Sequence, residues 1–197
     1  MRILCLYSNE CALELFGWLE EQGNDIILCN EKIDINWLCK ERFDLAISYT
    51  YPYIISLEVI EQLDGQIINL HNSYLPFDKG TSPNIWNIIE GTPRGVTIHY
   101  IDSGLDTGDI IAQKLVELDN NFTLRTSYIQ LDIAVKELFK TVFVNYKFWD
   151  SMRKKCIGGG TYHKESDLNE IIGCFDNWSY EINVEDFRQH VINKLFC

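Results

Sequence analysis

Short apolar runs alternate with segments of helical periodicity through the first 72 residues of the chain. The runs indicate β-strands because they are short, apolar and bounded by polar residues or proline. The segments between them space apolar residues three and four positions apart, and two of them stop at glycine, which is typical of α-helices. We expect strands at 2–8, 25–30, 43–52 and 66–72, and helices at 11–23, 36–42 and 56–65. This rhythm predicts an α/β fold with a Rossmann-like, mostly parallel sheet flanked by helices.

The rest of the chain continues the pattern and then changes character. We expect a helix at 84–91, strands at 95–102 and 108–118, and a long amphipathic helix at 124–149. A glycine-rich polar segment and a short mixed tail follow. The predicted domain organisation is one catalytic domain over residues 1–150 and a carboxy-terminal extension over residues 151–197 that packs on it.

Charge and cysteine content exclude several classes of protein. The net charge of −12 is spread along the 197 residues and would repel a polyanion, so we expect no nucleic-acid partner. The seven cysteines contain no C-x-x-C pair, which predicts neither a zinc motif nor a disulfide framework. Most of them are expected to be reduced and buried, as in a cytoplasmic protein. We expect no signal peptide and no membrane span, because no apolar stretch is long enough.

An asparagine and a histidine close the expected strand at 66–72, in the sequence "INLHNSYLP". Ligands of open α/β sheets bind outside the carboxyl ends of the strands, where Asn69 and His71 are expected. Side chains two residues apart on a strand point to the same side, so both would face one pocket. An amide and an imidazole together can hold a carbonyl and move a proton. The alternative is a polar pair that satisfies the turn that follows.

The sequence "DSGLDTGD" at 102–109 places three aspartates between two expected strands. Asp and Gly are ordinary turn residues, which is the simplest interpretation. A calcium loop fits poorly, because Gly104 would occupy its third position and Gln113 the place of its bidentate glutamate. A third interpretation is that one aspartate pairs with His71 and orients its ring.

The motifs "INLHNSYLPFDKGTSPNIW" and "GVTIHYIDSGLDTGDII" together resemble the core of the folate-dependent formyltransferase family. This resemblance covers roughly residues 40–150 well and the first strand and helix loosely. Within the family, the chain looks most like the nucleotide-sugar N-formyltransferases. The resemblance implies a catalytic trio of Asn69, His71 and Asp106, and it implies no metal.

The cosubstrate implied by the resemblance is 10-formyltetrahydrofolate. A dinucleotide is not expected, because no G-x-G-x-x-G follows the first strand. The pterin would be held largely by main-chain groups of two segments, the one after the third strand and the aspartate loop. The implied cofactor-binding residues are Ser48, Tyr49, Tyr51, Pro52, Tyr53, Ile54, Asp102, Gly104, Leu105 and Asp109.

The acceptor implied by the resemblance is the amine of a nucleotide-linked amino-dideoxy sugar, for example dTDP-4-amino-4,6-dideoxyglucose. Such sugars enter bacterial surface polysaccharides, including the O-antigen of lipopolysaccharide. Methionyl-tRNA is not expected, since its formyltransferases carry a further carboxy-terminal domain and a basic surface. The implied substrate-binding residues are Ser73, Tyr74, Lys79, Thr81 and Asn84, and a homodimer is the implied assembly.

Two alternatives to this function remain. The chain could formylate another small amine such as glycinamide ribonucleotide, although its phosphate-binding glycine-rich loop is not apparent. It could also be a non-catalytic binding module of the same fold. The other three histidines, His99, His163 and His190, are interpreted as isolated residues that are structural or exposed.

Overall fold

A computed structural model describes residues 1–195 of the chain and has the expected α/β architecture. A six-stranded sheet has the order β2-β1-β3-β4-β6-β7. Its strands are β1 (Arg2–Leu6), β2 (Asp25–Cys29), β3 (Leu45–Ser48), β4 (Ile67–His71), β6 (Gly95–Tyr100) and β7 (Ile110–Leu115). Contacts divide the chain into two compact units. The first holds residues 1–71, 98–112 and 142–156, and the second holds residues 72–97, 113–141 and 157–197.

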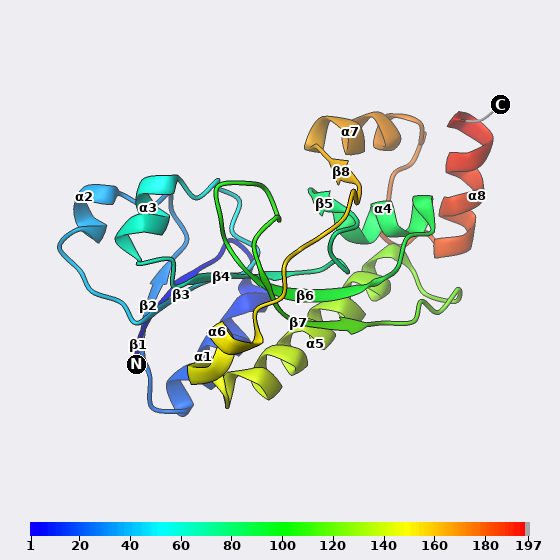
Figure 1. The fold of residues 1–197 in the computed structure, drawn as a ribbon. Coiled ribbons are helices and arrows are strands. Elements are labelled where there is room, and N and C mark those ends of the chain that lie inside the picture. The colour runs from blue at the N-terminus through cyan, green and yellow to red at the C-terminus, as the bar shows by residue number, and fades with distance from the viewer. Residues whose placement is uncertain (196–197) are drawn as a thin grey trace. The chain divides into compact units, whose positions relative to one another are not determined.

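The first unit contains the parallel part of the sheet, which confirms the predicted fold class (Figure 1). β1 pairs in parallel with β2 and with β3, and β3 pairs in parallel with β4. The helices of this unit are α1 (Leu13–Glu21), α2 (Ile35–Leu38), α3 (Leu57–Gln62) and α6 (Trp149–Met152), with 3-10 turns at Glu10–Ala12 and Tyr146–Phe148. The register sets Ser48 of β3 beside Asn69 of β4, so two predicted site residues are neighbours on adjacent strands.

Apolar residues of the strands and of α2 and α3 form the core on one face of this sheet. Leu4, Leu6 and Ala46 are fully buried there, together with Leu38 of α2 and Ile60 of α3. The side chains of Asp34 and Ser56 accept hydrogen bonds from the first turns of α2 and α3, respectively. Such caps satisfy backbone N–H groups that a helix leaves unpaired, which helps to define where these two short helices begin.

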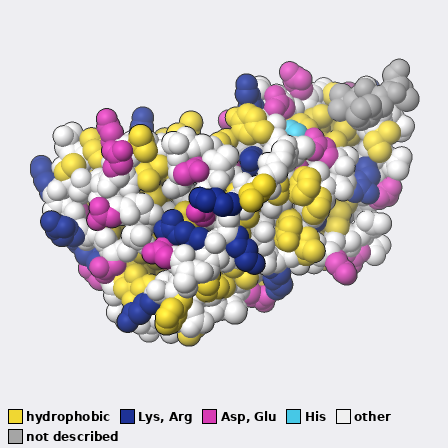
Figure 2. Space-filling model, in the orientation of Figure 1, with side chains coloured by type: hydrophobic (Ala, Val, Ile, Leu, Met, Phe, Trp, Pro, Cys, Tyr) yellow, Lys and Arg dark blue, Asp and Glu magenta, His cyan; other side chains and the backbone are white. Residues whose placement is uncertain are grey.

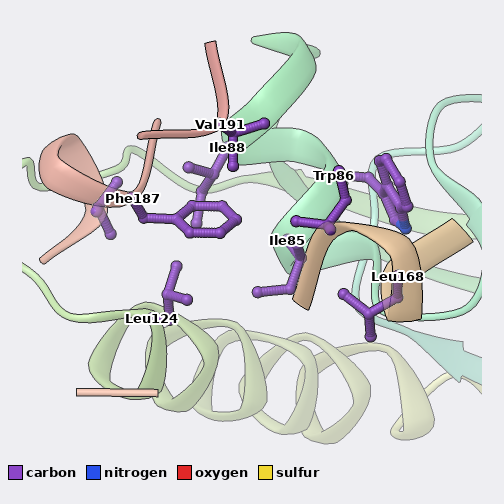
Figure 3. Packing of buried hydrophobic residues seen from close by; sticks show 9 residues of the cluster. Ile85, Trp86, Ile88, Leu124, Leu168, Phe187 and Val191 are labelled. Atoms are coloured by element: carbon purple, nitrogen blue, oxygen red, sulfur yellow. The ribbon is translucent and has the colours of Figure 1, made fainter. Parts of the chain in front are cut away.

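The second unit contains a small two-stranded sheet, β5 (Lys79–Gly80) with β8 (Tyr162–His163), and four helices. The helices are α4 (Pro83–Glu90), α5 (Leu124–Phe143, of which the last two residues belong to the first unit), α7 (Glu165–Gly173) and α8 (Val184–Leu195). Figure 3 shows their core, in which Ile85 and Ile88 of α4 lie among Leu124, Phe187 and Val191. All of these side chains are at least 96% buried.

Glycines end the first, third and fourth helices much as the sequence predicts. Gly91 adopts φ 67° directly after α4, and its N–H donates to Asn87 O. Gly23 and Gly65 also have positive φ, 83° and 69°, in the turns after α1 and α3. This left-handed conformation costs glycine little, which explains why these helices stop there.

Several helices are shorter than predicted, and in two cases the structure shows contacts made just beyond the helix end. The helix expected at 36–42 ends at Leu38, and Glu41 beyond it forms an ion pair with Arg2, 2.6 Å away. The helix expected at 124–149 ends at Phe143. Just past that end, the indole of Trp149 donates to Val142 O at 3.1 Å and so satisfies a carbonyl of the last turn. Both helix ends depend on contacts that periodicity does not reveal.

The carboxy-terminal segment contributes more structure than its mixed composition indicates. Two helices, α7 and α8, lie in this segment, and their side chains Leu168, Ile171, Phe187 and Val191 are buried in the core of the second unit. The boundaries of the two units defined by contacts do not lie at residue 150. The predicted division into a catalytic domain and an extension packed on it therefore stays a prediction.

Surface properties agree with a chain whose charge is dispersed. Figure 2 shows acidic and basic side chains mixed over the face that it draws. Among residues 1–195, none of the helices combines the length and apolar character needed to cross a bilayer. The expectation that most cysteines are buried is wrong for the described ones, because only Cys5 is buried and Cys39 is exposed. Cys197 lies outside the described residues.

Candidate active site

The predicted trio meets at one place in the first unit, together with a fourth residue. Nε2 of His71 lies 3.6 Å from Oδ2 of Asp106, and Nε2 of His99 lies 3.6 Å from Oδ1 of the same carboxylate. Nδ2 of Asn69 is 3.3 Å from Nε2 of His99. The two imidazole rings are nearly perpendicular, with centroids 6.0 Å apart. The Asp106 carboxylate therefore lies beside both rings, at distances longer than a direct hydrogen bond.

Internal hydrogen bonds and a close backbone approach fix the shape of the aspartate loop at 102–109. Oδ1 of Asp102 accepts hydrogen bonds from the Gly104 N–H at 3.0 Å and from the Thr107 hydroxyl at 2.6 Å. A Cβ at Gly108 would lie only 1.8 Å from Tyr100 O, so only glycine fits there. Asp106 itself has φ 52°, a left-handed conformation that aspartate tolerates better than most residues. The hydrogen bonds of Asp102 thus agree with its interpretation as a turn residue, whereas the Asp106 carboxylate lies beside the two histidines.

His99 is held in one tautomer by its neighbours. Nδ1 lies 2.8 Å from Tyr100 O, and a carbonyl only accepts hydrogen bonds, so Nδ1 carries the proton. Burial lowers the pKa of His99 to about 4, against smaller opposing effects of Asp106 and of the bond to Tyr100, so the ring is neutral near pH 7. Its Nε2 must then accept a hydrogen bond from Nδ2 of Asn69. This contact fixes which way the Asn69 amide points and leaves its second N–H for another acceptor.

His71 has an unused hydrogen-bonding atom at the same place. Its side chain is 9% exposed, and Nε2 is buried with no hydrogen-bond partner in the described structure. A buried polar atom without a partner is uncommon, because it loses its hydration without compensation. An uncommitted imidazole nitrogen beside a carboxylate and an amide can bind an oxygen or exchange a proton with a ligand.

His99 is a site residue that sequence reasoning missed. We interpreted it as isolated, and that is wrong, since it contacts Asn69 and lies close to Asp106. The signal was present in "GVTIH", where the histidine falls near the carboxyl end of an apolar strand. Only the sheet order, which places β6 next to β4, shows that this end lies beside Asn69.

The substitution His99→Gln should make the free energy of unfolding depend less on pH between about 6.5 and about 4. The unfolded chain binds a proton at His99 below about pH 6.5, whereas the folded chain does so only near pH 4. Acidification therefore favours the unfolded state, and stability is lost as pH falls through this window. The loss attributable to His99 approaches about 3 kcal/mol at its acid end. Urea unfolding at about pH 7.5 and about pH 5 measures it.

The same experiment contains its own control. At about pH 7.5, His99 is neutral in both states, so any loss of stability in the variant there reports packing and hydrogen bonds alone. An equal pH dependence in the two proteins would show that His99 titrates normally in the folded state.

The predicted cofactor-binding residues all belong to the first unit. Ser48 and Tyr49 are buried, whereas Tyr53, Ile54 and Leu105 are exposed. The Tyr51 hydroxyl donates to Glu31 O at 2.7 Å and accepts from the Ile33 N–H, so its donor and one acceptor position are used within the protein. Pro52, Asp102 and Gly104 are exposed, and Asp109 pairs with Lys155 at 3.0 Å. Two hollows of this unit, beside α2 and α3 and beside Met1, contain none of these residues.

The predicted substrate-binding residues all belong to the second unit. Ser73 is buried and its hydroxyl has no hydrogen-bond partner among the described residues. Tyr74, Lys79 and Thr81 are half-buried. Lys79 is the first residue of β5, and Thr81 directly follows this strand. Asn84 is buried, with its amide bonded to the Ser127 hydroxyl and to Leu124 O. These bonds tie α4 to α5 and favour a structural role for Asn84 over contact with a substrate.

The family of the chain follows from a match to a model of known sequences. Residues 30–142 match the family described as formyl transferase, which is more than half of the chain and includes Asn69, His71, His99 and Asp106. The chain belongs to the formyl transferase family. This confirms the resemblance that the motifs indicated.

Relatives within the family differ in the acceptors that their names give. The formyltransferase PseJ of Anoxybacillus kamchatkensis has been solved with UDP-4,6-dideoxy-4-formamido-L-AltNAc and tetrahydrofolate. Its structure is similar to this chain with a TM-score of 0.85 and 35% sequence identity, and the match covers 95% of this chain and 97% of PseJ. The dTDP-4-amino-4,6-dideoxyglucose formyltransferase of Mycobacterium bovis is 33% identical over 79% of this chain and 63% of its own length. Methionyl-tRNA formyltransferase of Finegoldia magna is 29% identical over 88% of this chain and 55% of its own length. The chain thus spans little more than half of these two curated relatives.

Proposed function

We propose that this chain is a folate-dependent N-formyltransferase that moves a formyl group from 10-formyltetrahydrofolate to the amine of a nucleotide-linked amino-dideoxy sugar. The observation that carries this proposal is the likeness to PseJ, which extends over nearly all of both chains at 35% identity. The PseJ complex holds a formylated sugar nucleotide and tetrahydrofolate. A UDP-linked 4-amino-4,6-dideoxy sugar is therefore the first acceptor to test, ahead of the dTDP-linked example expected from the sequence.

The cluster of Asn69, His71 and Asp106 supports the reaction. It offers an unpartnered buried Nε2 on His71, an amide whose second N–H is available, and a carboxylate between two rings. When bound, 10-formyltetrahydrofolate supplies the formyl carbon that the acceptor amine attacks. Asn69 and His71 would donate to the formyl oxygen as negative charge develops on it, a contact worth on the order of 3 kcal/mol per donor.

Asp106 has the chemistry to handle the proton of the attacking amine. A neutral amine becomes positively charged as it attacks, and a nearby carboxylate can accept the proton that it must lose. That proton would pass to the folate nitrogen as the bond between this nitrogen and the formyl carbon breaks. His71 lies 3.6 Å from this carboxylate, so a proton can pass between them through the substrate or through water. Asp106 and His71 both remain candidates for the base, and their pH profiles distinguish them.

The remaining binding residues stay proposals. Main-chain groups of residues 48–54 and of the loop at 102–109 are proposed to hold the pterin. Ser73, Tyr74, Lys79 and Thr81 are proposed to contact the acceptor. Cytoplasmic location, a role in surface polysaccharide synthesis and a homodimer also stay predictions.

The test is a product assay with the purified chain, 10-formyltetrahydrofolate and a panel of amines. The panel contains UDP-, dTDP- and GDP-linked 4-amino-4,6-dideoxy sugars, glycinamide ribonucleotide and methionyl-tRNA. We expect mass spectrometry to show a gain of one formyl group on a sugar nucleotide only. Formylation of methionyl-tRNA or glycinamide ribonucleotide alone would overturn the sugar assignment. Tight folate binding without turnover of any amine would favour the non-catalytic module.

A further inference from the structure

Three side chains with metal-binding atoms converge in the second unit, outside the cluster described above. They are Asp78, which precedes β5, Glu90, the last residue of α4, and His163 of β8. One ligand atom of each lies within 4.8 Å of those of the other two. The convergence is produced by the fold, because 85 positions separate the first from the last in the sequence.

These side chains bring acceptor atoms together without a basic side chain to balance them. Asp78 is only 1% exposed, and within residues 1–195 no Lys or Arg pairs with it. Within residues 1–195, Nε2 of His163 is buried and makes no hydrogen bond, although it lies 3.2 Å from Oε1 of Glu90. An imidazole nitrogen and two carboxylates that converge in this way can each offer a lone pair to one metal ion.

Neighbouring groups hold two of the three side chains in position. The Thr92 hydroxyl donates to Oδ2 of Asp78 at 2.6 Å, and the Thr161 hydroxyl donates to Oδ1 at 3.2 Å. The His163 ring stacks on Trp86, with centroids 3.9 Å apart and planes within 6°. Hydrogen bonds to a carboxylate ligand and a fixed imidazole plane are the supports that metal sites use.

The backbone around these residues is also closely fitted. Gly80 of β5 has φ 89°, and a Cβ there would lie 2.3 Å from His163 O. The Thr81 N–H donates to that same oxygen at 3.1 Å. The site is thus built from packed backbone as well as side chains.

We propose that Asp78, Glu90 and His163 bind one zinc ion, with water completing the coordination. One imidazole nitrogen and two carboxylate oxygens are a donor set that Zn²⁺ accepts, whereas Ca²⁺ and Mg²⁺ prefer oxygen alone. The order of affinities of divalent metals places Zn²⁺ well above Mn²⁺ for such donors. The ion joins α4 to the segment 161–163 and stabilises the second unit. This role is independent of the proposed formyl transfer.

The experiment measures binding of zinc chloride to the full chain by equilibrium dialysis and elemental analysis. We expect one ion per chain and a higher thermal midpoint in its presence. Glu90→Gln should raise the Kd by at least roughly tenfold, and His163→Gln should abolish binding. Glu90 is exposed, so its variant should fold, and circular dichroism checks this. Glu170→Gln, an exposed glutamate of α7, is the matched control and should bind like the unchanged protein.

Cysteine thiolates are the main competing source of zinc binding, and cobalt distinguishes them. Co²⁺ bound by nitrogen and oxygen lacks the intense sulfur-to-metal charge-transfer band that thiolate ligands produce. A strong band of this kind, a Kd weaker than about 1 mM, or equal affinities of the Glu90→Gln and Glu170→Gln variants would each overturn the proposal.

Discussion

The substitution His71→Ala should lower kcat for formyl transfer roughly 10²- to 10⁴-fold while leaving the fold intact. Nε2 of His71 is buried without a hydrogen-bond partner among residues 1–195, and it lies 3.6 Å from the Asp106 carboxylate. Its removal eliminates both a donor to the developing oxyanion and a route for the proton. Steady-state kinetics with the acceptor identified in the product assay measure the loss, and circular dichroism verifies the fold.

A second variant of the same residue separates the two functions of His71. The side chain in His71→Gln keeps a hydrogen-bond donor but does not titrate. Activity within about tenfold of the unchanged protein would assign His71 to oxyanion stabilisation. Activity as low as that of His71→Ala would assign it to proton transfer. Near-normal turnover by the alanine variant would remove His71 from the catalytic trio.

The substitution Asp106→Asn should lower kcat by a similar factor, roughly 10²- to 10⁴-fold. The Asp106 carboxylate lies 3.6 Å from both imidazoles. The substitution removes the charge and basicity of this group while keeping the shape of the side chain. Asparagine also tolerates the left-handed backbone at this position, where φ is 52°, so the loop should retain its conformation. The kcat/KM profile against pH shows whether the fall in rate at low pH, where a base is protonated, is lost with Asp106.

Asp64→Asn is the matched control for this substitution. Asp64 belongs to the same unit, has nearly the same φ of 51° and is exposed in the turn after α3. Its variant makes the same chemical change in the same backbone conformation, away from any histidine contact in the described structure. We expect its activity and stability to match those of the unchanged protein. Full activity of Asp106→Asn would contradict the assignment of this aspartate.

Periodicity was sufficient for most elements of the first unit. Strands β1 to β4 fall within the predicted runs. The side chains of β1, β3 and β4 are nearly all buried, so their sequences are almost continuously apolar, whereas β2 at the sheet edge is half-buried or exposed. The ends of α2 and α5 were not predictable in this way. Each depends on a partner distant in sequence or beyond the helix, Arg2 for the segment after α2 and Trp149 for the end of α5.

The carboxy-terminal segment shows a different limit of sequence reasoning. Its apolar residues are sparse between charged ones, so the sequence predicts only a glycine-rich polar segment and a short mixed tail there. In the structure, Leu168 and Phe187 are buried against Ile85 and Ile88 of α4. A few well-placed side chains are enough for a core when other elements supply the remaining surface.

For the candidate site, the sequence by itself determined the residues Asn69, His71 and Asp106, because their motif and spacing identify a family. Only the tertiary structure decided that His99 joins them and that Asp102 serves the loop. The convergence of Asp78, Glu90 and His163 could likewise not be predicted from the sequence. The physical reason is that a motif records neighbours along the chain, whereas tautomers, burial and charge balance depend on neighbours in space.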